Sequence, residues 1–385
     1  MAPWLAAMWL VAGTAQADQN VQVHGFLSQA AVHTDANNVG GSSEDGVGLD
    51  LRELGVNASY RPNGDWLLSA QALARWAGDS DEGDARLDYA FVDRTLSSDA
   101  SHRVDVQVGK VKNPYGLYNT TRDVAHTRPG VLMPQSIYLD QVRNFFLASP
   151  GVSFTGDVYR GEDVMNWTLN FMRPEVDDEA MTAFMVTQQP GHFEGRNSWL
   201  GQWLWEHDGA RWRAGLTLGS VAMKYHPTPT EFLQPGRIRL NTGVLSLQHN
   251  RENVVLTAEY ALVRQLRNGF GVPALDLDTT VEAAYVQGEW RFRPAWRAYA
   301  RYEELYLDRD DRDGEGFSAL SGLPAIQRYA KDAVLGVRFD ATPGWALSAE
   351  LHQVNGTAWL PRLDNPAAQM QKHWHMLLLQ AAYRF

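Results

Sequence analysis

The 385-residue sequence contains no cysteine, which excludes a disulfide scaffold, a thiolate metal site and a cysteine nucleophile. Long apolar runs are also missing. After residues 1–17, no stretch approaches the roughly 20 residues that a membrane-spanning helix needs. Positive charge is scarce, because 34 Lys and Arg stand against 45 Asp and Glu, a formal net charge of -11. Nucleic acid binding requires a basic surface. We therefore exclude a helical membrane protein and expect no nucleic-acid partner.

Aromatic residues, by contrast, are abundant. The chain has 14 Trp, 14 Tyr and 14 Phe, far more than a disordered polymer contains. Its mean hydropathy is nevertheless only -0.35. A transmembrane β-barrel fits both values, because its lipid-facing residues occupy only every second position of each strand.

Residues 1–17, MAPWLAAMWLVAGTAQA, have the form of a secretory signal peptide. Pro3 to Gly13 is a short apolar run, and Ala15-Gln16-Ala17 has the small-x-small pattern of a signal-peptidase site. The run has no Lys or Arg before it, which departs from the usual pattern, and a buried N-terminal helix is the alternative. We predict a signal peptide at 1–17 and an exported mature domain at 18–385.

Alternation of apolar and polar residues recurs from Val21 to the end of the chain. Val104, Val106 and Val108, for example, are separated by polar residues. A period of two with one apolar face is typical of a half-buried strand. The pattern predicts sixteen strands, at residues 21–33, 47–60, 65–76, 85–95, 102–111, 149–157, 164–173, 198–207, 210–224, 236–250, 252–266, 279–292, 296–306, 328–340, 344–356 and 371–385.

The connections between these runs alternate between short and long. The seven short ones carry Gly, Pro, Asn, Asp or Ser, the residues of tight turns. The eight long ones lie at 34–46, 77–84, 112–148, 174–197, 225–235, 267–278, 307–327 and 357–370. Outer-membrane barrels have short periplasmic turns and long extracellular loops. Neither a β-sandwich nor a propeller, the two soluble alternatives, predicts this alternation.

Four tryptophans occupy equivalent positions in the pattern. Each of them begins a strand directly after a short turn, where a barrel places its interfacial ring of aromatic residues. They are Trp66, Trp212, Trp296 and Trp345. The sequence therefore predicts an all-β fold, a single sixteen-stranded antiparallel transmembrane β-barrel with short periplasmic turns and long extracellular loops.

Two short motifs add a family resemblance. The segment Gly109–Leu117, GKVKNPYGL, resembles the strand-to-loop passage GK-x-K-x-P-[FY]-G of phosphate-selective-type porins. The C-terminal Tyr383-Arg384-Phe385 resembles the signal that barrel-assembly machinery reads in the Gram-negative outer-membrane porin superfamily. This resemblance implies a homotrimer in contact with outer-membrane lipid and lipopolysaccharide, with the third long loop folded into the lumen. The dense Arg and Lys ladder that would identify phosphate as the solute is missing.

Polar residues between the lipid-facing rows are expected to face the lumen. Arginine predominates among them, which predicts a net positive wall and a modest anion preference. The predicted pore-lining residues are Arg75, Arg86, Arg103, Arg211, Arg213, Arg239, Arg297 and Arg301. Alternatively, these arginines pair with acids on neighbouring strands and only stiffen the barrel.

The longest loop, residues 112–148, is expected to form the constriction. Arg122, Arg128 and Arg143 would attract anions through bidentate donors. Asp123 and Asp140 would orient those arginines. Aromatic and imidazole side chains complete the predicted site, at Tyr115, Tyr118 and His126. The alternative is that this loop packs outside the barrel and holds ordinary salt bridges.

We therefore expect a porin for passive diffusion of small hydrophilic solutes. A substrate-specific channel for an anionic or aromatic nutrient is the first alternative, and an outer-membrane enzyme or adhesin is the second. Neither G-x-S-x-G nor H-E-x-x-H occurs in the sequence. We accordingly expect no enzymatic activity, no catalytic or metal site and no cofactor.

Overall fold

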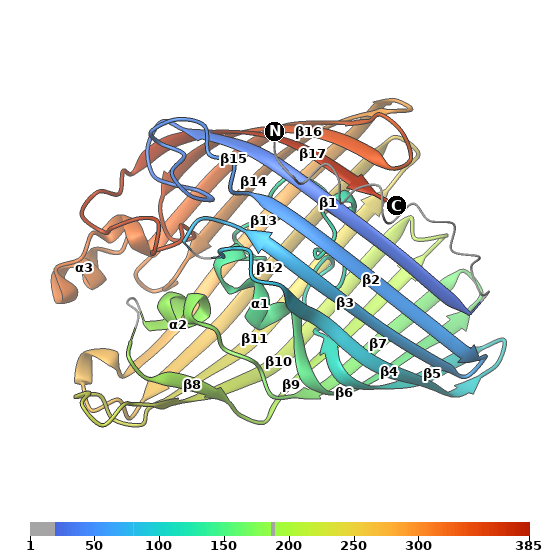
Figure 1. Cartoon of the computed structure of the whole chain (residues 1–385), viewed down its shortest axis with the longest axis horizontal. Coiled ribbons are helices and arrows are strands. Elements are labelled where there is room, and N and C mark those ends of the chain that lie inside the picture. Colours follow the sequence, from blue (N-terminus) through green and yellow to red (C-terminus); the bar gives the residue numbers. More distant parts are fainter. Residues whose placement is uncertain (1–19, 80, 186–188) are drawn as a thin grey trace.

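Sixteen strands close into one antiparallel barrel (Figure 1). The computed structural model describes residues 20–79, 81–185 and 189–385, so the predicted signal peptide at 1–17 lies outside the described residues. Neighbouring strands pair in chain order, and β1 pairs with both β2 and β17, which closes the sheet. The first strands are β1 (Val21–Thr34), β2 (Arg52–Asn63), β3 (Trp66–Trp76), β4 (Arg86–Ser98), β5 (His102–Lys112), β6 (Ala148–Arg160), β7 (Asp163–Met172), β8 (His192–Gly195) and β9 (Ser198–His207).

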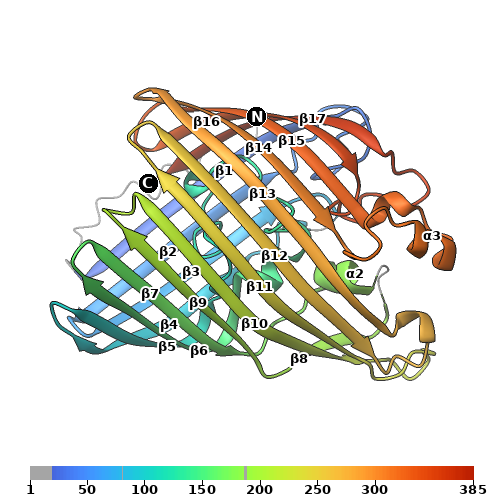
Figure 2. The ribbon, with the colours of Figure 1, turned by 180° about the vertical axis from the view of Figure 1, so that it is seen from behind.

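The second half of the chain continues the same meander. Its strands are β10 (Trp212–His226), β11 (Arg237–Asn250), β12 (Val254–Asn268), β13 (Leu277–Arg293), β14 (Trp296–Tyr306), β15 (Tyr329–Asp340), β16 (Trp345–Gly356) and β17 (His373–Arg384). β8 and β9 are two parts of one barrel strand, because both pair with β10. Figure 2 shows β10–β14 side by side on the far wall.

The predicted strands are confirmed, with differences at their ends. The largest concerns the run predicted to begin at residue 47, since β2 begins at Arg52. Residues 47–51 stay in the connection, where Gly48 alone forms an isolated bridge to Val32. The predicted strand at 198–207 is preceded by β8, which lies in a segment expected to be loop.

Short and long connections fall at opposite ends of the barrel. The helices of the described residues all belong to long connections and comprise α1 (Arg143–Leu147), α2 (Asp178–Met185) and α3 (Glu315–Ser321), with 3₁₀ turns at Ala125–Thr127, Asp140–Val142, Pro273–Leu275 and Ala325–Arg328. α2 and α3 mark the end with the long connections (Figure 1). Among the described residues, none of these helices is long and apolar enough to cross a membrane.

The outer face of the wall is apolar, as the alternation predicted. Leu335, Leu245 and Val286 are among its exposed side chains. The four predicted tryptophans are the first residues of β3, β10, β14 and β16. All four lie at the end of the barrel with the short turns.

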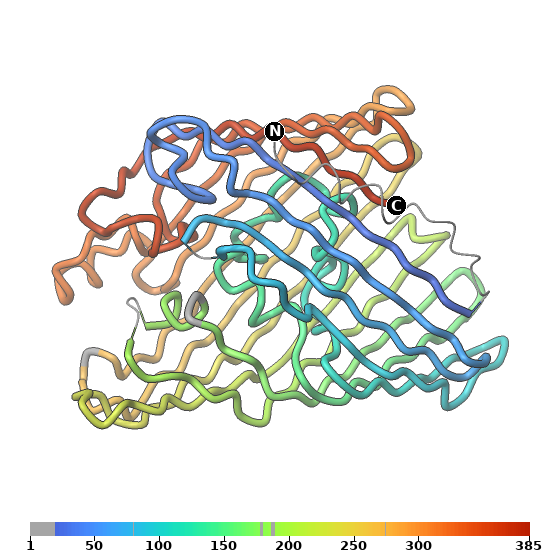
Figure 3. The backbone as a smooth tube through the Cα atoms, viewed as in Figure 1, coloured from blue at the N-terminus to red at the C-terminus, as the bar shows by residue number. Residues whose placement is uncertain are grey.

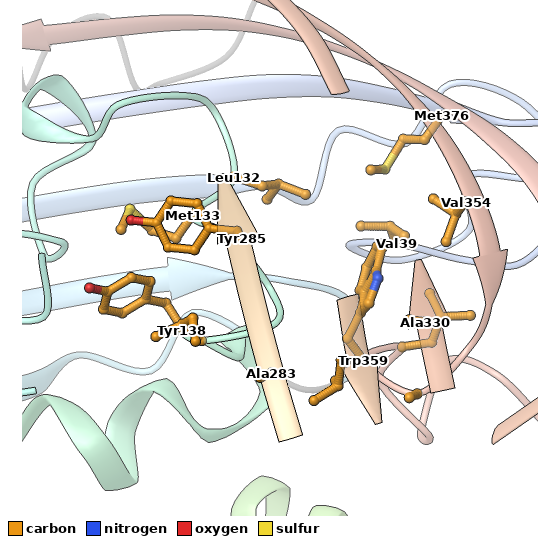
Figure 4. Close-up of a cluster of buried hydrophobic side chains, with 14 of the residues drawn as sticks. Val39, Leu132, Met133, Tyr138, Ala283, Tyr285, Ala330, Val354, Trp359 and Met376 are labelled. Carbon is orange, nitrogen blue, oxygen red and sulfur yellow. The ribbon is translucent and has the colours of Figure 1, made fainter. Parts of the chain in front are cut away.

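Part of the interior is filled with apolar side chains. Figure 4 shows Leu132 and Met133 of the β5–β6 connection facing Val354 and Met376 of the wall, with Trp359 of the β16–β17 connection beside them. Fully burying one such side chain contributes about 1.5–3 kcal/mol. The apolar contacts therefore hold the connection of residues 113–147 inside the barrel, where the tube in Figure 3 traces it.

Candidate functional site: the constriction inside the barrel

The chain turns into the lumen in the second half of the GKVKNPYGL motif. Gly109 still lies within β5, where it pairs with Gly151, whereas Gly116 follows the strand. Gly109 has a φ of 137° and Gly116 a φ of 56°, a region that favours glycine. A Cβ on Gly109 would lie 2.3 Å from the carbonyl oxygen of Ala90, and one on Gly116 would lie 2.3 Å from Oη of Tyr138. Gly116 is thus the hinge at the start of the inward segment, residues 113–147.

Replacing Gly116 by valine is expected to displace the inward segment while the barrel still folds. The side chain would meet a strained φ and push Tyr138 away, but it touches no strand pairing. We expect faster proteolysis within residues 113–147 and an altered single-channel conductance, with unchanged heat-modifiable gel migration. Gly64→Val is the control, since Gly64 has open space around it. Wild-type proteolysis and conductance in the Gly116 variant would contradict the hinge.

Three carboxylates on the wall accept hydrogen bonds from the inward segment. Glu350 on β16 accepts from the backbone N–H of Val131 at 2.9 Å and of Leu132 at 3.1 Å. Glu303 on β14 accepts from the N–H of Ser136 at 2.7 Å. Glu259 on β12 accepts from the N–H of Leu117 at 2.9 Å and from the Tyr138 hydroxyl at 2.5 Å. Bonds to an ionised acceptor are the stronger kind, so these carboxylates are the anchors of the segment.

The opposite side of the segment forms ion pairs with β2, β3 and β4. Arg143 donates to Asp88 of β4 at 3.0 Å, and Arg128 donates to Glu53 of β2 at 2.7 Å. Arg122 donates to the carbonyl of Tyr138 at 3.0 Å and to Asp140 at 3.4 Å. The three predicted anion-attracting arginines therefore all lie inside the barrel, and each contacts a carboxylate.

The predicted orienting residues differ in their contacts. Asp140 pairs with Arg122 and with Arg75 of β3, as an orienting residue should. Asp123 instead accepts from Nζ of Lys112 at 2.9 Å and from the Gln71 side chain at 2.9 Å. It therefore fixes the start of the segment rather than a guanidinium.

The remaining predicted constriction residues also lie in the lumen. Tyr115 is buried against Tyr138 and Phe146, and the Tyr118 hydroxyl accepts from Gln248 at 2.9 Å. Burial, with Arg338 nearby, lowers the pKa of His126 to about 4. His126 is thus neutral at pH 7 and adds no positive charge.

Most of the predicted wall arginines face the interior and are paired. An acidic group lies within ion-pair distance of Arg75, Arg86, Arg103, Arg213, Arg297 and Arg301. The separations are 2.7 Å for Arg86–Asp81 and 3.0 Å for Arg301–Glu303, for example. This is the pairing alternative that the sequence left open.

Two predicted wall arginines lie elsewhere. Arg211 is in the turn before β10, exposed and paired with Asp208 at 2.8 Å, because β10 begins one residue later. Arg239 is exposed on the outer face, because its neighbours Ile238 and Leu240 point inward. The prediction assumed that apolar rows always face lipid, and this fails where the interior itself holds an apolar cluster.

A polar gap remains between the inward segment and strands β1–β3. It is a small cavity of about 30 Å³ lined by residues that include Ser28, Glu53, Arg75, Arg128 and Asp140. The lining and the ion pairs that continue from it toward β4 and β5 hold charges of both signs, seven cationic and five anionic: Arg52, Arg75, Arg86, Lys112, Arg122, Arg128 and Arg143 against Glu53, Asp81, Asp88, Asp123 and Asp140. The gap is a narrow, charged space between the segment and the wall.

Asp364 ties three long connections together at the barrel mouth. Its Oδ1 accepts from the N–H of Asp79 at 2.8 Å, and its carbonyl accepts from Asn38 at 3.3 Å. Burial raises the pKa of Asp364 to about 6, and the carboxylates of Asp79 and Asp50 add to the rise.

The three connections that meet at Asp364 are therefore expected to become less stable as the pH rises from about 4 to 6. Over that window the folded mouth holds a proton that the opened mouth releases, so its stability falls with increasing pH. Amide hydrogen exchange of residues 35–47 and 77–79, corrected for intrinsic rates, should show the loosening. Asp364→Asn should remove it and exposed Asp310→Asn should not. An unchanged pH dependence in Asp364→Asn would refute the assignment.

Comparison with solved structures identifies the fold. The chain superposes on an anion-selective porin from Comamonas acidovorans with a TM-score of 0.60 at 11% identity, covering 95% of this chain and 99% of that one. For the outer-membrane channel DcaP of Acinetobacter baumannii the TM-score is 0.61 at 11% identity, with 96% and 99% covered. For the trimer form of in-vitro folded OmpT, an outer membrane protein of Vibrio cholerae, it is 0.57 at 12% identity, with 95% and 99% covered.

Sequence comparisons add nothing to this. No protein-family model matches the chain, and no curated protein matches it in sequence. The likenesses establish a barrel of the porin fold.

Proposed function

We propose that this chain is an outer-membrane porin, a channel for passive diffusion of small hydrophilic solutes and ions. The observation that carries the proposal is the polar gap between the inward segment and the wall of a closed sixteen-stranded barrel. A segment that is anchored inside the barrel narrows the lumen without adding a soluble domain or a plug. The porin fold of the solved neighbours supports the same function.

A modest anion preference follows from the charge of the gap. Seven cationic side chains against five anionic ones leave a small excess of positive charge in a confined passage, and such an excess favours anions. The resemblance of GKVKNPYGL to phosphate-selective-type porins makes phosphate one anion to test. Chloride serves as the reference.

The assembly we propose is a homotrimer embedded in outer-membrane lipid and lipopolysaccharide. The apolar outer face and its four tryptophans support the lipid contact, and one neighbour of the same fold was solved as a trimer. Barrel-assembly machinery would bind the last strand, which ends at Phe385. The short turns would then lie in the periplasm and the long connections outside.

Conductance of the refolded mature protein in a planar bilayer under a salt gradient tests the proposal. We expect stepwise current and a reversal potential on the anion side. Steps with a cation preference would keep the porin and refute the charge argument. A folded barrel that passes no current would refute the porin and favour an outer-membrane enzyme or adhesin.

One observation favours a second candidate, a substrate-specific channel. A larger cavity beside the gap combines arginines with apolar walls, which a general diffusion pore does not require. Conductance that saturates with one solute would distinguish this channel from a general pore.

A further inference from the structure

A cavity of about 140 Å³ lies between the inward segment and the wall strands β11–β14, whose ribbons Figure 2 shows side by side. Arg328 and Arg362, which belong to long connections, line one part of this cavity. Arg122 lines both this cavity and the gap, so the two spaces are neighbours. An apolar cavity of about 150 Å³ is large enough to bind a benzene molecule. This cavity therefore has room for one small aromatic solute.

Three arginines reach this cavity from separate elements. Arg267 belongs to β12, Arg328 to the end of the β14–β15 connection, and Arg362 to the β16–β17 connection. Unlike the arginines of the gap, none of them forms an ion pair with any residue that the structure describes.

Neutral groups orient the three guanidiniums instead. Arg362 donates to the Gln327 side chain at 3.1 Å, and Arg328 donates to the carbonyl of Leu307 at 3.4 Å and stacks on Phe317. Arg267 donates to the Gln265 oxygen at 2.9 Å when that amide is turned toward it. The positive charges are therefore held in place without being neutralised.

The partial burial of these cations has a measurable cost. Burial lowers the pKa of Arg362 to about 10, and Arg328 adds to the effect. Burial also lowers the pKa of Arg328, against the opposing pull of Asp308 and Asp311. Nε of Arg328 is buried without a hydrogen-bond partner among the described residues. An anion in the cavity would relieve both the repulsion and the missing hydrogen bond.

The remaining lining is apolar and partly aromatic. Phe146 and Phe184 contribute rings, and Val263, Val281 and Leu305 contribute aliphatic surface. Such walls do not favour a small, strongly hydrated inorganic ion. They stabilise a solute that has a flat hydrocarbon body as well as a charge.

We propose that this cavity, which we call the arginine vestibule, binds aromatic carboxylates on their way to the gap. The carboxylate would accept hydrogen bonds from Arg328, Arg362 and Arg267, and the ring would lie against Phe146 and Phe184. The proposal rests on the porin function and gives it a substrate class, in which the charge selects the anion and the walls select its body.

Benzoate is the probe for this site. With the refolded full-length mature protein in a bilayer and chloride as background, added benzoate should reduce the current in a saturable way. Benzylammonium, which has a similar ring and the opposite charge, should not. In the double variant Arg328→Gln/Arg362→Gln, the benzoate concentration that halves the current should rise about tenfold or more, because charge-assisted hydrogen bonds are lost. Arg264→Gln is the matched control, since Arg264 is exposed and paired with Asp278 at 2.6 Å.

Equilibrium dialysis of radiolabelled benzoate against the folded protein in detergent separates the two proposals. Chloride current without saturable benzoate binding would overturn the vestibule and leave the porin intact. Benzoate binding that depends on Arg328 and Arg362, without any current, would uphold the site and overturn the porin. Equal block by benzoate and benzylammonium, or equal binding by the double variant and wild type, would overturn the role of the arginines. Only variants that show the heat-modifiable migration of a folded barrel enter the comparison.

Discussion

Replacing Arg122, Arg128 and Arg143 together by serine is expected to turn the channel from weakly anion-selective to cation-selective. The change leaves Asp88 and Glu53 without their segment partners and leaves Asp140 with Arg75 alone. Four cationic side chains then face five anionic ones in and beside the gap, so the local excess changes sign. Under a salt gradient in a planar bilayer, the reversal potential should cross zero.

The control for this triple variant replaces three exposed arginines, Arg196, Arg264 and Arg309, by serine. Their side chains lie outside the gap, and screening by salt removes most of their effect. A second variant adds Glu53→Gln, Asp88→Asn and Asp140→Asn to the triple change, and it should bring the reversal potential back toward the wild-type value. An unchanged reversal potential in the triple serine variant would show that the charges of the gap do not set the ion selectivity.

Releasing the anchors should have the second large effect. In Glu259→Gln/Glu303→Gln/Glu350→Gln, the inward segment loses its ionised acceptors, and each hydrogen bond to a charged group contributes about 1.5–3 kcal/mol. The segment should leave the lumen for part of the time, because only its apolar packing and its ion pairs with β2, β3 and β4 remain. We expect single-channel conductance to rise by about twofold or more, with frequent transitions between levels.

Changing three exposed glutamates to glutamine, at Glu44, Glu162 and Glu252, tests whether lost negative charge alone raises the conductance. Limited proteolysis provides an independent measurement, since residues 113–147 should become cleavable only when released. Wild-type conductance together with wild-type protease resistance in the anchor variant would show that apolar packing holds the segment without the carboxylates.

The strands could be predicted because one face of each contacts a uniform apolar surrounding. Apolar and polar residues therefore alternate along each strand. This alternation made the sixteen strands and their connections predictable. The same reasoning failed at Arg239, where the inward side chains Ile238 and Leu240 are apolar too. When both surroundings are apolar, alternation gives no information on which face is which.

The composition of the constriction was partly predictable, and its contacts were not. Arg122, Arg128, Arg143 and Asp140 meet inside the barrel as expected. The anchoring role of Glu350 could not be read from the sequence, because the groups of the inward segment that it binds are the backbone N–H groups of Val131 and Leu132, which every residue but proline carries. The vestibule was also missed, because Arg267, Arg328 and Arg362 come from three connections or strand ends and meet only in three dimensions.

The pairing of β1 with β17 has a consequence for how the chain assembles. Phe26 pairs with Arg384, and the backbones of Gly25 and Phe385 exchange hydrogen bonds at 3.0 and 3.1 Å. Every other neighbouring pair of barrel strands is close in sequence, so these pairs can form early as hairpins. The contact between β1 and β17 joins the two ends of the barrel sequence, and its loop-closure entropy cost is therefore the largest. We therefore expect closure to be the last step, and until then two open edges would be free to pair with another copy of the chain. Loss of the final residues would turn this seam into a site of aggregation.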